Sequence, residues 1–550
     1  MAWYDEAVFY HIYPLGMTGA PKQNRYGEPV HRLNTLIPFI SQIKKLGCNA
    51  IYIGPLFESV GHGYETTDYK KLDTRLGTNE DLTGFVAECH KQGIRVILDG
   101  VFHHTGRDFF AFKDIRLNRE FSKYKDWYCN VNFYGNNEYN DGFSYDNWGG
   151  YDLLAKLNQH NHEVREYICD VIRFWVKEFD IDGIRLDAAD VLDFGYMQML
   201  RQVANEVKPD FWLMGEVIHG DYIRWVNGET LHAVTNYHLH KALYSGHNDH
   251  NYFEIAHTVK RLYEMGGNRP DGLKLYNFVD NHDVERIYTK LNHKGHFIPV
   301  HILMYTLPGV PSVYYGSEFG IEGRKQRGSD DSLRPFISYE QYIKDTQNNH
   351  FVKLISRLGE IRKETKALSY GDYKELLLTN GQYAFSRNYH GQSVIVTVNN
   401  GDDDFSMNLP VPHAEAYVGG ISGVKVNVKD GCISVNVRAN SGEIWLPVDE
   451  TERCIQPIEL EAFKAVEPVV QEKRPEPEVV VHEEASVQTE PNSEIKHNKT
   501  FEEMTVEELQ EAILERMRRN GPVTEQMKKD VFENVYHNSL VTWIQSFNEK

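Results

Sequence analysis

The sequence predicts an α/β protein whose main part is a (β/α)8 TIM barrel. Short apolar runs alternate with longer amphipathic patterns from residue 7 to about residue 366, and there are eight such runs. Eight strands alternating with helices over this length favour a closed parallel barrel over an open sheet. The strand-like runs cover residues 8–13, 50–53, 96–98, 183–186, 211–214, 233–235, 275–278 and 312–315.

Helical patterns separate these runs, most clearly at residues 36–46, 80–93, 162–179 and 194–208. Two segments interrupt the alternation. Residues 105–158 are long, aromatic and turn-rich, which predicts a small inserted subdomain (B subdomain), and residues 316–350 form a second, looser excursion. The barrel is therefore expected at residues 1–104 and 159–370.

The pattern changes after Gly371. Period-2 stretches at residues 393–398 and 424–428 lie between Asn-Gly, Asp-Gly and Gly-Gly turns, which predicts a C-terminal antiparallel β-sandwich at residues 371–450. Residues 451–500 are rich in Glu, Pro and Val and are interpreted as a linker. A capping box, Thr505-x-x-Glu508, opens a predicted two-helix tail at residues 501–550. The tail either forms its own core or docks on a partner or a second subunit, as in a homo-oligomer.

Composition narrows the classes of partner and compartment. The net charge is −20, so the chain repels phosphate backbones and anionic lipids, and neither nucleic acid nor a membrane is an expected partner. No run approaches the ~20 consecutive apolar residues of a spanning helix, and the first residues lack a secretory leader pattern. The 6 cysteines are scattered singly, without a Cys-x-x-Cys pair. Together these features predict a cytoplasmic protein with reduced thiols.

Acidic residues follow four of the predicted strands. Asp99 follows the third strand, Asp187 the fourth, Glu216 the fifth and Asp283 the seventh. In a parallel barrel the carboxyl ends of the strands meet at one rim, where active sites lie. Any one of these acids could be a helix N-cap or part of a surface ion pair, but together they predict a catalytic site.

Paired carboxylates on neighbouring strands suit glycosidic bond cleavage. One carboxylate attacks the anomeric carbon, and a second, protonated one donates to the departing oxygen. Retention of configuration needs the two groups about 5–5.5 Å apart, which adjacent strands can supply. Arg185 lies two residues before Asp187, on the same face of the strand, where it can hold that carboxylate ionised.

Two other classes of function use the same residues. A metal-dependent barrel enzyme would bind Mg²⁺ with the strand-end acids, and it would also carry a basic phosphate cradle or a lysine base, which the sequence lacks. A catalytically decayed barrel scaffold would show gaps among the acids, and none is missing.

Four motifs resemble, in order and spacing, the signature regions of the α-amylase family of glycoside hydrolases. They are Asp99-x-Val-x-His-His104, Gly183-x-Arg-x-Asp187, Gly215-Glu216 and Phe278-x-x-Asn-His-Asp283. The resemblance covers residues 7 to about 448. After Asp187 the sequence runs Ala-Ala-Asp190, and after Glu216 it runs Val-Ile-His219, both similar to the neopullulanase and cyclomaltodextrinase side of the family. Those relatives usually carry an extra N-terminal β domain, whereas the first strand begins almost at once here.

The resemblance implies a role for each matching residue. Asp187 would be the nucleophile, Glu216 the general acid/base and Asp283 the stabiliser of the transition state. The residues expected to bind substrate are Tyr64, His104, Arg185, His219 and His282.

The resemblance also implies retaining hydrolysis of α-glucosidic bonds, mainly α-1,4, in maltooligosaccharides or cyclodextrins. A transglycosylase or an α-1,6-glucosidase of the same family is the alternative, since the same carboxylates serve both. No organic cofactor is expected. Many family members ligate calcium through an Asn where this chain has His103, and an imidazole is a poor ligand for a hard cation, so a calcium site is not expected there. Chain-length preference and oligomeric state stay open.

Overall fold

A computed structural model describes residues 2–267, 272–412, 414–448, 455–458, 460, 509–514 and 531. It separates into two units, residues 1–469 and residues 470–550. The predicted linker at 451–500 lies almost wholly outside the described residues. Most of the predicted two-helix tail lies outside them too, and within it residues 509–514 and 531 are helical. In the described part of the chain, no helix is both long and apolar enough to cross a bilayer.

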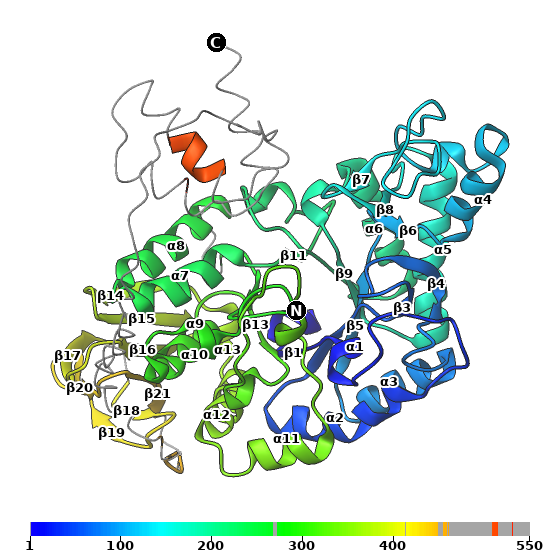
Figure 1. The fold of residues 1–550 in the computed structure, drawn as a ribbon. Coiled ribbons are helices and arrows are strands. Elements are labelled where there is room, and N and C mark those ends of the chain that lie inside the picture. Colours follow the sequence, from blue (N-terminus) through cyan, green and yellow to red (C-terminus); the bar gives the residue numbers. More distant parts are fainter. Residues whose placement is uncertain are drawn as a thin grey trace, which may run out of the picture. The chain divides into compact units, whose positions relative to one another are not determined.

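Eight parallel strands form the central sheet of the first unit, in the order β11-β10-β9-β5-β2-β1-β13-β12. A parallel bridge between Thr235 and Tyr276 joins the two ends of this order, so the sheet closes into the predicted barrel (Figure 1). The barrel strands are β1 (Phe9–Ile12), β2 (Ala50–Ile53), β5 (Arg95–Gly100), β9 (Gly183–Leu186), β10 (Trp212–Gly215), β11 (Ala233–Val234), β12 (Tyr276–Phe278) and β13 (Val310–Tyr314).

Alternation along each strand separates an inner core from an outer core. Phe9, Ile97 and Trp212 belong to a cluster inside the barrel, whereas Ile184 and Leu186 belong to the cluster that faces the helices. Successive strand residues point to opposite faces, so Arg185, between Ile184 and Leu186, points into the barrel. Both cores are apolar, which explains why the barrel strands read as continuous apolar runs.

Helices surround the barrel (Figure 1). α5 is typical: the Asn161 side chain caps its first turn, its buried face includes Ile172 and Trp175, and it ends at Asp180, which has a left-handed backbone with φ 55°. The α-helices outside the insert are α1 (Pro14–Met17), α2 (Ile37–Lys45), α3 (Asn79–Lys91), α5 (His162–Phe179), α6 (Phe194–Val207), α7 (Tyr237–Asn248), α8 (Tyr252–Met265), α9 (Ile287–Lys290), α10 (Phe297–Thr306), α11 (Tyr339–Thr346), α12 (His350–Glu364) and α13 (Lys366–Tyr370).

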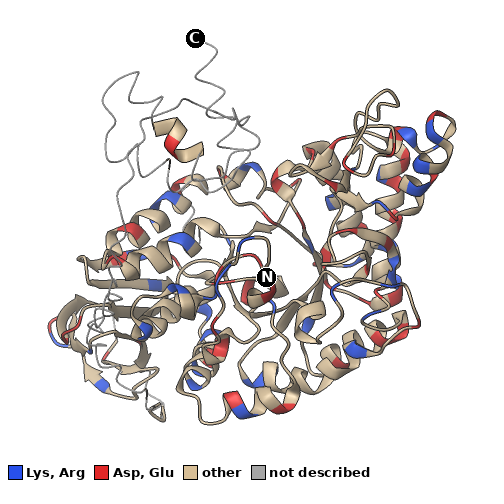
Figure 2. Ribbon diagram, in the orientation of Figure 1, with Lys and Arg blue, Asp and Glu red and all other residues tan. Residues whose placement is uncertain are grey.

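The outer helices carry both signs of charge, interspersed along their surfaces (Figure 2). Ion pairs such as Arg173–Glu206, between α5 and α6, join neighbouring helices at 3.0 Å. Such exposed pairs contribute little to stability individually, and the excess of acidic residues gives the net charge of −20.

Two excursions leave the carboxyl rim of the barrel. After β2, the strands β3 (Phe57–Ser59) and β4 (Thr66–Leu72) form a small antiparallel pair. After β5, the strands β6 (His104–Gly106), β7 (Asn147–Trp148) and β8 (Tyr151–Lys156) form a three-stranded sheet with α4 (Phe110–Asn118) beside it. This second excursion occupies the segment that the sequence predicts as the inserted subdomain.

The C-terminal β domain contains a six-stranded antiparallel sheet and a two-stranded one, β17 with β20. Met407 and Ile433 of the smaller sheet share a buried cluster with Ile395 and Trp445 of the larger sheet, which is the packing of a sandwich. The strands are β14 (Lys374–Leu378), β15 (Gln382–Tyr389), β16 (Gln392–Asn399), β17 (Phe405–Pro410), β18 (Ala416–Gly419), β19 (Lys425–Asn427), β20 (Cys432–Val437) and β21 (Ser441–Val448).

Glu318, in the turn after β13, is completely buried and accepts a hydrogen bond of 2.7 Å from the Tyr10 hydroxyl. Burial raises its pKa to about 7, from an ordinary value of 4.5. A carboxyl that is neutral in the fold and charged in the unfolded chain lowers stability as pH rises from about 4.5 to 7, by about 3 kcal/mol in total. We therefore expect the unfolding free energy of Glu318→Gln, relative to that of the parent, to rise by about 1 kcal/mol from pH 6 to pH 8. Urea unfolding at the two pH values measures this change. The same difference in unfolding free energy between variant and parent at both pH values would contradict this.

Candidate active site

The register of the barrel strands places Asp187 and Glu216 at the same height. Leu186 of β9 pairs with Gly215 of β10, and each acid follows directly. The ladder continues through both acids, since the Asp187 N–H donates to the Gly100 oxygen at 3.0 Å and the Glu216 N–H to the Leu186 oxygen at 2.9 Å. The two carboxylates therefore leave neighbouring strands at the same rim of the barrel.

The Arg185 guanidinium bridges the two carboxylates. Its Nη1 lies 2.8 Å from Asp187 Oδ1, and its Nη2 lies 2.9 Å from Glu216 Oε2. The Arg185 side chain is 3% exposed, whereas the carboxylates of Asp187 and Glu216 are 11% and 14% exposed. The cation is thus buried beneath two acids that still reach solvent, and the acids lie together as expected.

Asp99 lies deeper in the same cluster. Its Oδ1 accepts from Arg185 Nη1 at 2.9 Å, and its Oδ2 accepts from the hydroxyls of Tyr52 at 2.8 Å and Tyr64 at 3.1 Å. Its carboxylate is fully shielded from solvent. Asp99 is therefore placed to orient Arg185 and Tyr64 rather than to meet a substrate.

Three carboxylates share one guanidinium, and this sets the protonation of the cluster. Burial raises the pKa of Asp187 well above its ordinary value, the charge of Arg185 opposes this, and the charges of Glu216 and Asp99 add to it. Burial lowers the pKa of Arg185, but the nearby carboxylates outweigh it and raise that pKa. The site therefore favours a charged Arg185 and the retention of a proton among the acids.

Asp283 lies on the loop after β12, and each of its carboxylate oxygens has a cationic or imidazole neighbour. Oδ1 accepts from Arg334 Nη2 at 2.8 Å, and Oδ2 lies 3.0 Å from His282 Nε2. Burial acts to raise the pKa of Asp283, but His282, Arg334 and Arg185 outweigh it and lower the pKa. Asp283 is thus held ionised, with its side chain 36% exposed.

Tyr64 and His282 stack at the same rim. Their ring centroids are 5.7 Å apart with planes 12° from parallel, and the Tyr64 hydroxyl contacts His282 Nε2. Tyr13 stacks on His282 at 5.8 Å. The site thus has an aromatic wall beside Asp283, of the kind that suits the flat face of a sugar ring.

His104 is buried and 6.1 Å from the ring of Trp148, which lies in the insert. His103 and His104 do not point to opposite sides, as neighbouring residues of a strand would. Their Nδ1 atoms are 3.3 Å apart, because His103 lies in the loop between β5 and β6 rather than on a strand. Burial lowers the pKa of His103 to about 4 and that of His104 to about 3, so both are neutral near pH 7.

His219 is an exposed residue on the loop after β10. His219 acts electrostatically on Asp190 and His238. The structure therefore brings Tyr64, Arg185 and His282 together with Asp187, Glu216 and Asp283. His219 is exposed on its loop. Its expected contact with substrate stays a prediction.

His103 occupies the position at which the sequence resemblance puts a calcium-ligating Asn. His103 contacts another imidazole there, and imidazole nitrogens are poor ligands for hard cations. Within the described residues, no group of three or more His, Cys, Asp or Glu side chains converges on a position that could hold a metal ion.

The sequence reasoning missed two residues of the site, Tyr13 and Arg334. Tyr13 directly follows β1 in the structure, but the sequence places it inside the predicted strand at 8–13, so the rule that found the acids, a polar group just after a strand, did not find it. Arg334 lies in the irregular segment after β13, 51 residues from Asp283 in sequence. No local pattern marks it.

A parallel eight-stranded barrel with paired carboxylates at its carboxyl rim is the arrangement found in barrel glycoside hydrolases. The family model of the alpha amylase catalytic domain matches residues 31–357. A cyclomaltodextrinase from Thermoanaerobacter pseudethanolicus is 32% identical over 422 residues, 72% of this chain and 71% of that protein. An intracellular maltogenic amylase from Bacillus subtilis is 30% identical over 377 residues, 67% of this chain and 62% of that protein.

Among solved structures, a debranching enzyme from Nostoc punctiforme is similar with a TM-score of 0.69 and 27% identity, covering 81% of this chain and 98% of that one. The chain belongs to the α-amylase family of glycoside hydrolases. This confirms the family, the barrel fold and the hydrolase class that the sequence predicts.

Proposed function

We propose that this protein hydrolyses α-1,4-glucosidic bonds in maltooligosaccharides or cyclodextrins by double displacement. The observation that carries the proposal is the pair of carboxylates, Asp187 and Glu216, joined by the single Arg185 guanidinium. Similarity to proteins named cyclomaltodextrinase and maltogenic amylase supports the substrate class.

In the first step the Asp187 carboxylate attacks the anomeric carbon while Glu216 donates its proton to the departing oxygen. A glycosyl ester on Asp187 forms, and the shortened sugar leaves. In the second step Glu216 removes a proton from water, which attacks the same carbon and frees Asp187. The first step needs a charged Asp187 and a protonated Glu216. Burial raises the pKa of Asp187, and the Arg185 guanidinium, 2.8 Å from Asp187 Oδ1, opposes this and favours the charged form that attacks.

The other side chains bind and polarise the glucose unit. Asp283, held ionised by His282 and Arg334, faces the positive charge that develops on the sugar ring. His104 Nε2 and His282 Nδ1 are buried without a hydrogen-bond partner among the described residues, and the two imidazoles are proposed to turn toward sugar hydroxyls when substrate binds. Tyr64 supplies the stacking face, and His219 is proposed to contact the sugar beyond the cleaved bond.

Product analysis tests the linkage. Purified enzyme is expected to cleave maltotriose and open β-cyclodextrin with retention of the α configuration, and to leave the α-1,6 bond of panose intact. Cleavage of that bond would support the α-1,6-glucosidase alternative, which the similarity to a debranching enzyme favours. In the reaction with maltotriose alone, products longer than maltotriose would indicate transglycosylation. The absence of any release from these three sugars would contradict the proposal.

The mechanism needs no organic cofactor, and no step of it uses calcium. A cytoplasmic location is proposed because Cys48, Cys89, Cys129, Cys169 and Cys432 are free thiols. The similarity to an amylase named intracellular also supports it.

A further inference from the structure

A buried ion pair, Asp73 with Arg75, lies in the loop between β4 and α3. The Arg75 side chain is 5% exposed and that of Asp73 is 1% exposed. The guanidinium makes a bidentate pair with the Asp73 carboxylate, with Nε to Oδ1 at 2.9 Å and Nη2 to Oδ2 at 2.7 Å. Such paired geometry is specific to arginine, since a lysine ammonium is a single point of charge.

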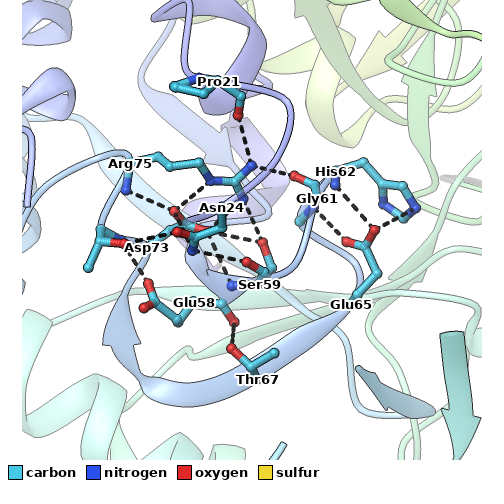
Figure 3. A network of polar contacts seen from close by, with 12 residues as sticks. Pro21, Asn24, Glu58, Ser59, Gly61, His62, Glu65, Thr67, Asp73 and Arg75 are labelled. Atoms are coloured by element: carbon cyan, nitrogen blue, oxygen red, sulfur yellow. Dashed lines mark hydrogen bonds and ion pairs between the residues drawn. The ribbon is translucent and has the colours of Figure 1, made fainter. Parts of the chain in front are cut away.

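The remaining donors of Arg75 reach two other segments of the chain (Figure 3). Nη1 donates to the carbonyl oxygens of Gly61 at 2.6 Å, Pro21 at 3.0 Å and Lys22 at 3.2 Å, and Nη2 donates to Ser59 Oγ at 2.9 Å. Both Nη groups and Nε are therefore engaged. One side chain joins the loop after α1, the turn that follows β3 and the loop before α3.

The turn that Arg75 holds at Gly61 leads directly to Tyr64. Glu65 directly follows Tyr64, and its carboxylate folds back onto the turn. It accepts from the His62 N–H at 3.3 Å (Figure 3) and from the Gly63 N–H at 3.1 Å. Gly63 has φ +102°, and a Cβ there would lie 2.2 Å from Pro55. The backbone on both sides of Tyr64 is therefore restrained, and its ring is held against His282.

We propose that Arg75 is a positioning residue for catalysis, because it fixes the turn at residues 61–65 and thereby the Tyr64 ring against His282 and Asp99. The role rests on the proposed function, since Tyr64 is the stacking face for the glucose unit that reacts. Arg75 does not touch the three acids. Its effect on the reaction passes through Tyr64.

A double-mutant cycle tests this role. Lys at position 75 keeps a positive charge beside Asp73 but cannot hold Asp73, Ser59 and Gly61 together. We expect Arg75→Lys to lower kcat for maltotriose by about 10- to 100-fold, with KM changed less than about threefold. In a Tyr64→Ala background the same substitution is expected to lower kcat/KM by less than about twofold, because the ring it positions is gone.

Arg107 provides the matched control. It is a buried arginine paired with Asp141 at 2.6 Å, in the insert, and Arg107→Lys is expected to have the same effect with and without Tyr64. Glu65→Gln is a second variant of the same turn and is expected to couple to Tyr64 as Arg75→Lys does. If Arg75→Lys does not fold, the coupling between Glu65→Gln and Tyr64→Ala tests the proposal in its place.

Equal effects of Arg75→Lys in both backgrounds, or of Glu65→Gln where the first variant is unfolded, would overturn the proposal. If Asp187→Asn keeps its turnover, the proposed function fails whatever the coupling. If Asp187→Asn is inactive, and the losses of activity from Arg75→Lys and Tyr64→Ala simply multiply in the double variant, only the role of Arg75 fails.

Discussion

Replacement of Asp187 by Asn is expected to lower kcat/KM for maltotriose by about 10⁴-fold or more, equivalent to about 5.5 kcal/mol of transition-state stabilisation. The amide cannot form the glycosyl ester, so both steps of the reaction are lost. It also leaves Arg185 with one charged neighbour fewer, although Asp99 and Glu216 still hold the guanidinium at 2.9 Å. The variant should therefore fold, which thermal unfolding would verify.

Asp193→Asn is the matched control for this experiment. Asp193 lies six positions further along the chain and caps α6 through a hydrogen bond from the Tyr196 N–H at 2.9 Å. Asn is an equally good cap, so this variant is expected to keep activity within about twofold of the parent. Parent-like turnover in Asp187→Asn, beside an active control, would refute the nucleophile assignment.

Glu216→Gln separates the two carboxylates by function. An α-maltosyl fluoride needs little help from an acid, because fluoride is a good leaving group, but hydrolysis of the intermediate still needs the base. Glu216→Gln should therefore release about one equivalent of fluoride per enzyme and then stall. Asp187→Asn should release none, so the burst assigns the two roles independently of the family resemblance.

The barrel could be predicted because it depends on local patterns. The predicted helix at 162–179 and the predicted strands at 50–53 and 183–186 have the bounds that α5, β2 and β9 have in the structure. Each of these segments has a clear apolar period and clear ends. The last barrel strand is less accurate, since β13 begins at Val310 rather than residue 312. Pro311 lies inside it, and proline normally indicates that a strand has not begun.

The acids of the site could be predicted for the same reason, whereas their partners could not. Asp187 and Glu216 directly follow strands, so the topology alone places them at one rim. Arg334 comes from the irregular segment after β13, and its contact with Asp283 depends on how that segment folds back over the barrel. The Arg75 network likewise joins three loops that share no periodic pattern. Long-range contacts between loops leave no trace in one sequence.

The protein is expected to lose its fold steeply as pH falls from about 6.5 to 5. Burial lowers the pKa values of seven histidines to about 3 or 4, so the folded state keeps them neutral where the unfolded chain binds protons. These are His103, His104, His232, His240, His247, His296 and His301.

The sign follows from linkage. A group whose pKa is depressed in the folded state loses stability as pH falls below its unfolded value, about 6.5 for histidine. Each of the seven contributes a slope that approaches about 1.4 kcal/mol per pH unit. Acids whose pKa burial raises, namely Glu318, Asp187, Asp190, Asp280 and Glu443, act in the opposite direction and offset part of this loss. The histidines alone lose on the order of 10 kcal/mol by pH 5, which is comparable to the whole stability of a typical domain.

Unfolding free energies from urea titrations between pH 7.5 and 5 would measure this slope. His301→Gln provides a specific test, because His301 is fully buried, its Nδ1 contacts the Phe297 oxygen at 2.7 Å, and its Nε2 has no partner among the described residues. Removing it should flatten the slope by about one proton, or about 1.4 kcal/mol per pH unit, whatever it does to stability at pH 7.5. The same substitution at the exposed His160 should leave the slope as in the parent. A stability that stays level from pH 7 to 5 would show that the folded protein takes up these protons, and that the packing around the seven imidazoles is looser than the structure has it.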